Sequence, residues 1–330
     1  MKKLAIAGCG GMIYGFIYEY TKALNLDLEA VSGEEAELQR FTKMYSVKRT
    51  FSDYAEMIDT VRPDLVIVYP SDETKQAGMV KTAMRAGADV LCERPICASI
   101  TEGEELIALQ KETGRFVMPR YNRRYMNAYI SAKHIMSSPE FGAPYMYSSS
   151  FHAGSYASEE KFIANHISHH LDLARMLLGE IELIHVKRIA ENDQRVGFNI
   201  VFESEKPGAQ GIKTLGNIQS NSFLCGDYPM ERLDISGNLC QIVVENVRNL
   251  RYSRPVKKLE NSDVEDFLAD GGTKILNMNY AQLNNFAFYG FENMLKEFVR
   301  CSEARIKPAQ DMEDALKTFK LVESLMKQVS

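Results

Sequence analysis

The chain has 330 residues, of which 45% are hydrophobic and 25% charged, and its formal net charge is −5. This length exceeds what one hydrophobic core usually serves, so two domains are expected. The acidic balance argues against a nucleic-acid-binding protein, and no apolar run is long enough to span a bilayer. Six scattered cysteines without a Cys-x-x-Cys pair, and a short, glycine-broken apolar stretch after the basic N-terminus, favour a cytoplasmic protein without a signal peptide.

The first predicted element is a strand at residues 4–7 that runs into Gly8-Cys9-Gly10-Gly11, followed by a helix at 12–24. Glycines allow a tight turn and a close backbone approach, and the positive end of a helix attracts phosphate. This is part of a dinucleotide-binding fingerprint, but Ile13 occupies its third glycine position. An ordinary strand-to-helix turn is the alternative interpretation.

Strand and helix patterns then alternate over roughly the first 120 residues. Short apolar, β-branched runs predict buried parallel strands at 28–31, 65–68, 90–92 and 116–118. Helical patterns lie between them at 34–45, 54–60, 74–86 and 100–113. This alternation predicts a doubly wound parallel sheet with helices on both faces.

Strand patterns without intervening helices dominate the next region. They fall at 145–151, 183–190, 197–202, 212–218, 232–235 and 241–244. Helices are predicted at 126–137, 159–178, 285–301 and 311–327. We therefore expect an α/β protein with a first domain at 1–121 and a second, α+β domain at 122–330 that contains an open, mostly antiparallel sheet.

Several segments together resemble one family. They are Gly8-Cys9-Gly10-Gly11, the segments 50–54, 63–70 and 86–95 (the last ending in Cys92-Glu93-Arg94-Pro95), Asn122-Arg123-Arg124, 169–175 and 178–180. In order and spacing, these segments are similar to those of the Gfo/Idh/MocA oxidoreductases, which include glucose–fructose oxidoreductase and inositol dehydrogenases. The resemblance implies a Rossmann domain, a second domain whose open sheet serves oligomerisation as a dimer or tetramer, and NAD(P)-dependent hydride transfer on a sugar, sugar derivative or cyclitol.

The resemblance places Arg94 where the family has a catalytic lysine beside nicotinamide. An arginine keeps the positive charge and can hold a hydroxyl, but it does not shuttle protons near neutral pH. A surface arginine at a strand end is the alternative. The family often has a cis peptide bond at Pro95, and the sequence leaves its isomer open.

A second cluster lies on the helix predicted at 159–178. Asn165, His169 and Asp172 fall at i, i+4 and i+7 and so share one helical face. The resemblance places His169 at the family's catalytic histidine and Asn165 at a position where the family has aspartate. Asparagine cannot accept a proton, so His169 is the predicted general base and Arg94 and Asn165 are predicted to position the hydroxyl.

Alternatives remain for the histidines. His169 could be a satisfied polar residue at a domain boundary. His166 and His170, also at i and i+4, could ligate a metal, although no His-Glu-x-x-His pattern or further ligand motif accompanies them. We therefore predict no metal site.

The predicted cofactor contacts are Gly8, Gly10, Gly11, Met12, Ser32, Gly33, Pro70, Ser71, Glu93 and Arg94. Ser32 ends the second strand, where NAD-preferring domains usually carry a carboxylate, so NADP is admitted. Glu34 and Glu35 follow and would repel a 2′-phosphate. The sequence leaves the choice between NAD and NADP open.

The predicted substrate contacts are Asn122, Arg124, Asn165 and His169, with a solvated basic turn as the alternative for 120–125. The leading hypothesis is a cytoplasmic NAD(P)-dependent dehydrogenase that acts on a small sugar-like molecule. One alternative is a glycoside-cleaving or lyase-type enzyme that uses its cofactor transiently. Another is a cofactor-binding sensor that has lost catalysis, since fold does not guarantee function.

Overall fold

The computed structural model describes the whole chain except residues 10–23, 208–210, 226–228, 256–272, 278–288 and 330. The described residues form two compact units. The first comprises Met1–Asn122 and Phe291–Lys320, and the second comprises Arg123–Gly290 and Leu321–Ser330. The interval 122–330 expected for the second domain is thus interrupted by residues 291–320, which pack with the first unit.

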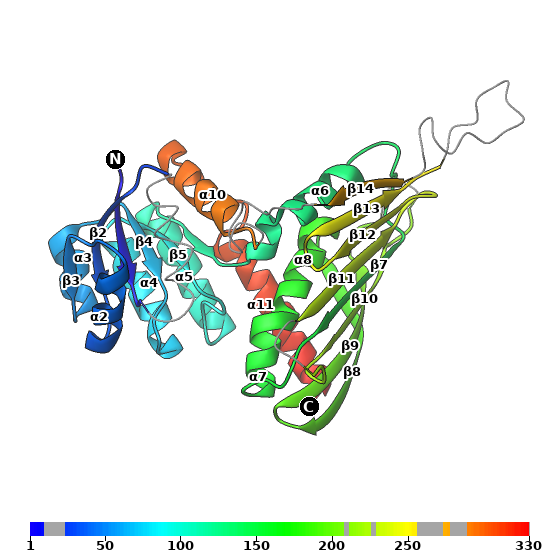
Figure 1. Ribbon diagram of the computed structural model, residues 1–330, viewed down its shortest axis with the longest axis horizontal. Coiled ribbons are helices and arrows are strands. Elements are labelled where there is room, and N and C mark those ends of the chain that lie inside the picture. Colours follow the sequence, from blue (N-terminus) through cyan, green and yellow to red (C-terminus); the bar gives the residue numbers. More distant parts are fainter. Residues whose placement is uncertain (10–23, 208–210, 226–228, 256–272, 278–288, 330) are drawn as a thin grey trace, which may run out of the picture. The chain divides into compact units, whose positions relative to one another are not determined.

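The first unit contains a six-stranded, all-parallel sheet in the order β3-β2-β1-β4-β5-β6 (Figure 1). Its strands are β1 Lys3–Ala7, β2 Asp27–Ser32, β3 Arg49–Phe51, β4 Leu65–Val68, β5 Asp89–Cys92 and β6 Val117–Pro119. The chain order reverses at β1, whose neighbours are β2 and β4. Ligands of such sheets bind outside the carboxyl ends of the strands at this reversal point.

The helices of this unit begin and end at residues with recognisable capping chemistry. Asp53 accepts the Glu56 N–H at 2.7 Å, and Ser99 accepts the Glu102 N–H at 3.1 Å, as N-cap side chains do. Gly114 closes its helix at φ +63°, a left-handed conformation that glycine adopts readily. The helices are α2 Glu35–Met44, α3 Tyr54–Val61, α4 Gln76–Arg85, α5 Ile100–Thr113 and α10 Phe291–Ala304, with a short 3₁₀ turn at Glu73–Lys75.

One core of the first unit lies between the sheet and α3, α4 and α5. Alternate strand residues such as Ala5, Val66 and Val90 face it, because successive strand side chains point to opposite faces. Met312 and Leu316 from the start of α11, Met312–Val329, complete this core. The predicted doubly wound sheet is confirmed.

The second unit contains an eight-stranded sheet in the order β14-β13-β12-β11-β7-β10-β9-β8. Only β7 and β10 pair in parallel, so the predicted open, mostly antiparallel sheet is confirmed. Its strands are β7 Met146–His152, β8 Ile181–Asn192, β9 Arg195–Ser204, β10 Leu215–Asn221, β11 Met230–Ser236, β12 Gln241–Glu245, β13 Asn249–Ser253 and β14 Thr273–Asn277.

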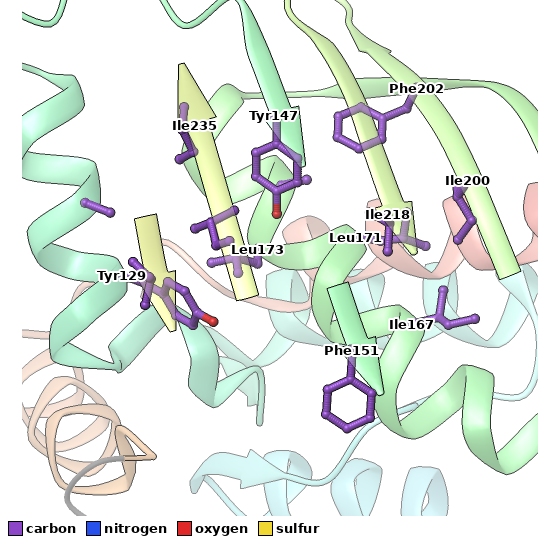
Figure 2. Packing of buried hydrophobic residues seen from close by; sticks show 14 of the residues in the cluster. Tyr129, Tyr147, Phe151, Ile167, Leu171, Leu173, Ile200, Phe202, Ile218 and Ile235 are labelled. Atoms are coloured by element: carbon purple, nitrogen blue, oxygen red, sulfur yellow. The ribbon is translucent and has the colours of Figure 1, made fainter. Parts of the chain in front are cut away.

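Helices cover one face of this sheet and enclose the core of the second unit (Figure 1). They are α6 Asn127–Met136, α7 Glu159–Phe162, a π-helical turn at Ile163–Ile167, α8 Ser168–Leu178 and the end of α11. Figure 2 shows Leu171 and Leu173 of α8 among strand residues such as Phe202 and Ile218. The helix expected at 159–178 is therefore continuous but contains one π turn.

The structure corrects the expected elements in a few places. Strands β3, β13 and β14 were not predicted, because each is short and more than half of its residues are polar. The helix expected at 285–301 is described only as α10, from Phe291, and residues 12–23 lie outside the described part of the chain. The six cysteines, all in described segments, form no disulfide, and Cys225 is the exposed one.

Candidate functional site

The carboxyl ends of β1, β2 and β4 border a cavity of about 270 Å³ in the first unit. It gathers five of the residues predicted to contact a cofactor: Gly8, Ser32, Gly33, Pro70 and Ser71. Gly10, Gly11 and Met12, which belong to the same prediction, lie outside the described residues. The cavity is located where the strand order reverses, as expected for a nucleotide site.

Gly8 is the residue with the strictest steric requirement at this cavity. Its φ is +87°, and its N–H donates to the Ser32 carbonyl at 2.8 Å. A Cβ atom on Gly8 would lie 2.0 Å from the Tyr69 carbonyl oxygen and 2.7 Å from the Pro70 Cα atom. Only glycine therefore lets β1 turn out of the sheet this close to the end of β4.

Two features of the cavity fit a dinucleotide. The Ser32 hydroxyl is buried and has no hydrogen-bond partner among the described residues, so it can bond a ligand hydroxyl. Gly33 begins the next turn, where a Cβ atom would lie 2.8 Å from the Cys9 Sγ atom. Gly8 and Gly33 thus place backbone without side chains at the cavity, where a dinucleotide approaches the backbone closely in this kind of fold.

The cavity is acidic. Its lining carries the carboxylates Glu34, Glu37, Asp53 and Asp72, and one ammonium group, that of Lys75. The Ser71 hydroxyl donates to a Glu37 oxygen at 2.5 Å. Burial, and next the charge of Glu37, raise the pKa of the Cys9 thiol to about 12, so this thiol is neutral and unreactive.

Sequence reasoning missed Glu37 and Asp53 as cavity residues. Asp53 had a readable signal, because it is the N-cap of α3 and N-caps of helices lie at the carboxyl edge of a parallel sheet. Glu37 lies in the first turn of α2, and its contact with Ser71 spans 34 residues, so the local pattern could not show it.

The next strand along the sheet, β5, ends beside the predicted residues Glu93 and Arg94. Arg94 is buried and the Arg94–Pro95 peptide bond is cis. The Glu93 carboxylate accepts from Arg120 Nε at 2.5 Å, from Arg120 Nη2 at 2.8 Å and from the Arg94 N–H at 3.0 Å. Burial acts to raise the pKa of Glu93, but Arg120 and Arg94 outweigh it and hold the pKa below its ordinary value.

A side chain from α4 also holds the backbone on both sides of Arg94. The Gln76 side chain donates to the carbonyls of Glu93 and Pro95, at 2.7 and 3.0 Å. Asn122 is also buried, and its side-chain oxygen lies 3.4 Å from Arg120 Nη1. Gln76, from the first turn of α4, is a positioning residue that no sequence motif announced.

In the second unit, the predicted residues lie at and just after the π turn. Asn165 belongs to the π turn and is half-buried, whereas His169, in the first turn of α8, is 3% exposed. A π turn holds more residues than an α turn, so the spacing of Asn165 and His169 departs from that of a regular helix. Such turns occur frequently at functional sites.

Arg124 is held by a carboxylate of the same unit. Its Nε and Nη2 atoms donate to the two oxygens of Asp172 at 2.8 and 2.7 Å, and Asp172 is fully buried. This bidentate pair fixes the chain just before α6 against α8. Both of these Arg124 donors are thus directed at Asp172 rather than at a substrate.

The two histidines near His169, which are His166 and His170, contact side chains of strand β7. The His166 ring stacks on Phe151 with 4.2 Å between ring centroids. His170 Nδ1 lies 3.2 Å from the Ser149 hydroxyl, and burial lowers the pKa of His170 to about 4. Among the residues that the structure describes, no three His, Cys, Asp or Glu side chains converge as metal ligands would.

The second unit also contains a cavity of about 520 Å³ near these residues. Phe151, Tyr156 and His166 supply its aromatic walls, and Gly154 and Ser155 line it with backbone and hydroxyl groups. Aromatic faces beside hydrogen-bonding groups suit a polyhydroxylated ring, which has apolar C–H faces and polar edges.

The described residues thus form an α/β protein whose first unit has the fold of a nucleotide-binding domain, with a cavity at the carboxyl ends of its strands. Residues 2–121 match the model of the Gfo/Idh/MocA family, described as an oxidoreductase family with an NAD-binding Rossmann fold. Over these residues the chain is similar to that oxidoreductase family.

Curated relatives match over part of their length. Inositol 2-dehydrogenase of Salmonella typhimurium is 28% identical over 136 residues, which are 40% of each chain. D-apiose dehydrogenase of Paraburkholderia graminis is 23% identical over 211 residues, 61% of this chain and 55% of that protein. The chain thus spans about half the length of these relatives or less.

Solved structures match over nearly the whole chain. A dehydrogenase from Chromobacterium violaceum superposes with a TM-score of 0.84 at 14% identity, covering 99% of this chain and 95% of that one. An oxidoreductase from Agrobacterium radiobacter, in complex with NAD+, L-tartaric acid and magnesium, superposes with a TM-score of 0.80 at 16% identity, covering 99% and 96%. At these identities the likeness shows the two-domain fold. Within the described segments, no helix has the length and apolar composition that crossing a bilayer requires.

Proposed function

We propose that this protein is an NAD-dependent dehydrogenase that acts on a secondary hydroxyl of a sugar, sugar derivative or cyclitol. The observation that carries the proposal is the cavity beside Gly8, whose turn has no room for a Cβ atom. The names of the relatives, inositol and apiose dehydrogenases, support a polyhydroxylated substrate. A homo-oligomeric, cytoplasmic protein remains the expectation that accompanies this proposal.

The charge of the cavity supports NAD over NADP. Four carboxylates and one ammonium group line it, so a 2′-phosphate would be brought among like charges. The buried Ser32 hydroxyl can instead bond a ribose 2′-hydroxyl. Ser32 thus takes the place of the carboxylate that usually ends the second strand, while Glu34 and Glu37 provide the negative charge.

The proposed chemistry needs a base and groups that orient the hydroxyl. His169 removes the O–H proton through an imidazole nitrogen, since neutral imidazole is a base near neutral pH. Asn165 and Arg94 hold the hydroxyl by hydrogen bonds without exchanging protons. When bound, the nicotinamide ring supplies the acceptor for the hydride that leaves the same carbon.

Conversion of NAD tests the reaction. With a panel of inositols, pentoses and hexoses, the wild-type protein should convert one NAD to NADH per substrate oxidised, followed by nicotinamide absorbance. His169→Asn should lower kcat by about 10²- to 10⁴-fold, the usual contribution of a general base. The matched control, His185→Asn, removes an exposed histidine of β8 and should leave kcat unchanged.

Arg94 and Asn165 give a specific reason to retain alternatives to the dehydrogenase. They stand where the resembled family has a lysine and an aspartate, so a sensor that binds the dinucleotide without turnover is the second candidate. Binding of NAD with no absorbance change across the panel would favour the sensor. Product formation without net NADH would favour transient use of the cofactor, as in a lyase.

A further inference from the structure

A second cavity of the first unit lies at the opposite edge of the sheet from the Gly8 turn. It encloses about 280 Å³ and is bordered by Asp89, which begins β5, and by the ends of α5 and α10. The cofactor cavity instead borders the carboxyl ends of the strands. We refer to the second one as the Asp89 cavity.

The Asp89 cavity concentrates positive charge in a protein whose formal net charge is −5. Four cations line it, namely Lys111, Arg115, Arg305 and Lys307, together with one carboxylate, Asp89. Glu313 and Asp311 already pair with the two lysines at 3.0–3.2 Å. Neither of these two carboxylates pairs with Arg115 or Arg305.

The carboxylate of Asp89 forms an ion pair with one of these arginines, Arg115, but not with Arg305. It accepts the Ser302 hydroxyl at 2.5 Å and the Phe116 N–H at 3.3 Å, and it lies 4.0 Å from Arg115 Nη1. Among the described residues, no carboxylate lies within ion-pair distance of Arg305. Arg305 is exposed and thus free to close on a ligand.

A neutral donor on the cavity wall has no acceptor. Gln110 is 2% exposed, and its Oε1 atom accepts the Val117 N–H at 2.8 Å, which fixes the orientation of the amide. Its Nε2 atom is buried and has no hydrogen-bond partner among the described residues. A buried amide nitrogen without a partner costs stability, and a ligand oxygen in the cavity would satisfy it.

The backbone of Arg305 strengthens this interpretation. Arg305 follows the last residue of α10 with φ +53°, and the Ile306 N–H donates to the Cys301 carbonyl at 3.0 Å. Glycine is the residue that suits this left-handed position. Cations also complement the carbonyl ends of helices, which accounts for the arginines but not for the Gln110 amide.

We propose that the Asp89 cavity binds a small dianion of the phosphate or phosphate-monoester class through Arg115, Arg305 and the Gln110 amide. Planar guanidinium groups match the oxygens of phosphate, and the four cations lining the cavity outnumber the three carboxylates that pair with them. A cavity of about 280 Å³ accepts an anion of this size, not a dinucleotide. The proposal does not depend on the function proposed above.

Calorimetric titration with inorganic phosphate at constant ionic strength tests the proposal, with succinate as a dicarboxylate and chloride as a monovalent anion. Wild-type protein should bind phosphate saturably and bind chloride not at all. Gln110→Glu keeps the oxygen for the Val117 N–H but turns the donor into a carboxylate. Arg305→Gly suits the left-handed backbone and removes one cation. Each variant should raise the dissociation constant for phosphate about tenfold or more.

Arg62→Gly is the matched control, because Arg62 also ends a helix, α3, in the left-handed conformation, at φ +47°, and does not line the cavity. It should bind phosphate as the wild type does. The proposal fails if phosphate gives no saturable heat, or if Gln110→Glu and Arg305→Gly bind it as well as Arg62→Gly does. Binding of succinate with the same variant dependence and higher affinity would reassign the ligand to the dicarboxylates and overturn the phosphate proposal.

Discussion

The Gly8 turn and the α7–α8 helical segment differ in what determines their structure. At Gly8, the limiting factor is space for one atom, and the residues concerned lie at strand ends that short apolar runs define. Along α8, polar residues are held by ion pairs from distant parts of the chain, such as Arg124 with Asp172. Adding one atom at Gly8 should therefore destabilise the first unit, whereas removing one charge from a buried ion pair should destabilise the second.

The largest effect is expected at a buried ion pair elsewhere in the second unit. Arg123 donates from Nε and Nη2 to the two oxygens of Glu231 at 3.0 and 2.5 Å, and both residues are buried. Arg123→Leu leaves the Glu231 carboxylate buried without its cation, so the free energy of unfolding should fall by about 3–5 kcal/mol. Urea denaturation measures it.

Arg232→Leu is the control for Arg123. Arg232 follows Glu231 on β11 and is exposed, and it pairs with Asp234 at 2.6 Å. Loss of this exposed pair should lower the free energy of unfolding by about 1 kcal/mol or less. Equal losses in the two variants would show that burial does not decide the strength of these pairs.

A slightly smaller effect is expected at the glycine turn. Gly8→Ala adds a left-handed alanine, at about 1–2 kcal/mol, and a clash with Tyr69, at about 1–3 kcal/mol. Gly87 has φ +93° with open space around its Cβ position, so Gly87→Ala should cost the conformational part alone. Thermal or urea unfolding of both variants separates the two contributions, and equal costs would contradict the steric account of Gly8.

Acid should weaken the second unit through His170. Burial lowers the pKa of His170 to about 4 from an ordinary value of 6.5. Between pH 6.5 and about 4, His170 is protonated in the unfolded chain but not in the folded protein. The free energy of unfolding should therefore fall as the pH drops through this range, by about 3 kcal/mol in total. Unfolding free energies measured across this range should lose most of that slope in His170→Asn and keep it in His185→Asn.

The smallest effect concerns cofactor choice. Glu37→Gln removes one carboxylate from the Gly8 cavity and should raise the affinity for NADP relative to NAD severalfold. Glu35 was expected to repel a 2′-phosphate as well, but it does not line the cavity. Glu35→Gln, two residues before Glu37 in α2, should therefore leave the ratio unchanged. Fluorescence titration with both dinucleotides gives the ratio, and no difference between the two variants would contradict the role of Glu37.

The sequence predicted the first unit well because its signals are local. Buried runs and capping residues place β4 at Leu65–Val68 and α5 at Ile100–Thr113, within the predicted bounds. The same chemistry predicted the turn at Gly8 and the position of Ser32 at a strand end. Contacts such as Ser71 with Glu37 were not predictable, because they depend on which helix the sheet brings to that edge.

Less of the second unit could be predicted. The helix at 159–178 was expected, but its π turn was not, because residue periodicity does not distinguish one extra residue in a turn. The partner of Arg123 lies 108 residues away at Glu231, and Arg123 is buried, so the alternative of a solvated basic turn at 120–125 is wrong at this residue. Asn165 and His169 were identified by resemblance, and their catalytic roles stay a prediction.

Calorimetric titration of NAD into wild-type, Gly87→Ala and Gly8→Ala protein measures whether the Gly8 cavity holds a dinucleotide. We expect one saturable site per chain in the wild type and in Gly87→Ala, tighter for NAD than for NADP. Folded Gly8→Ala should lose that binding. A folded wild-type protein that binds neither dinucleotide would show that the Gly8 cavity is not a dinucleotide site.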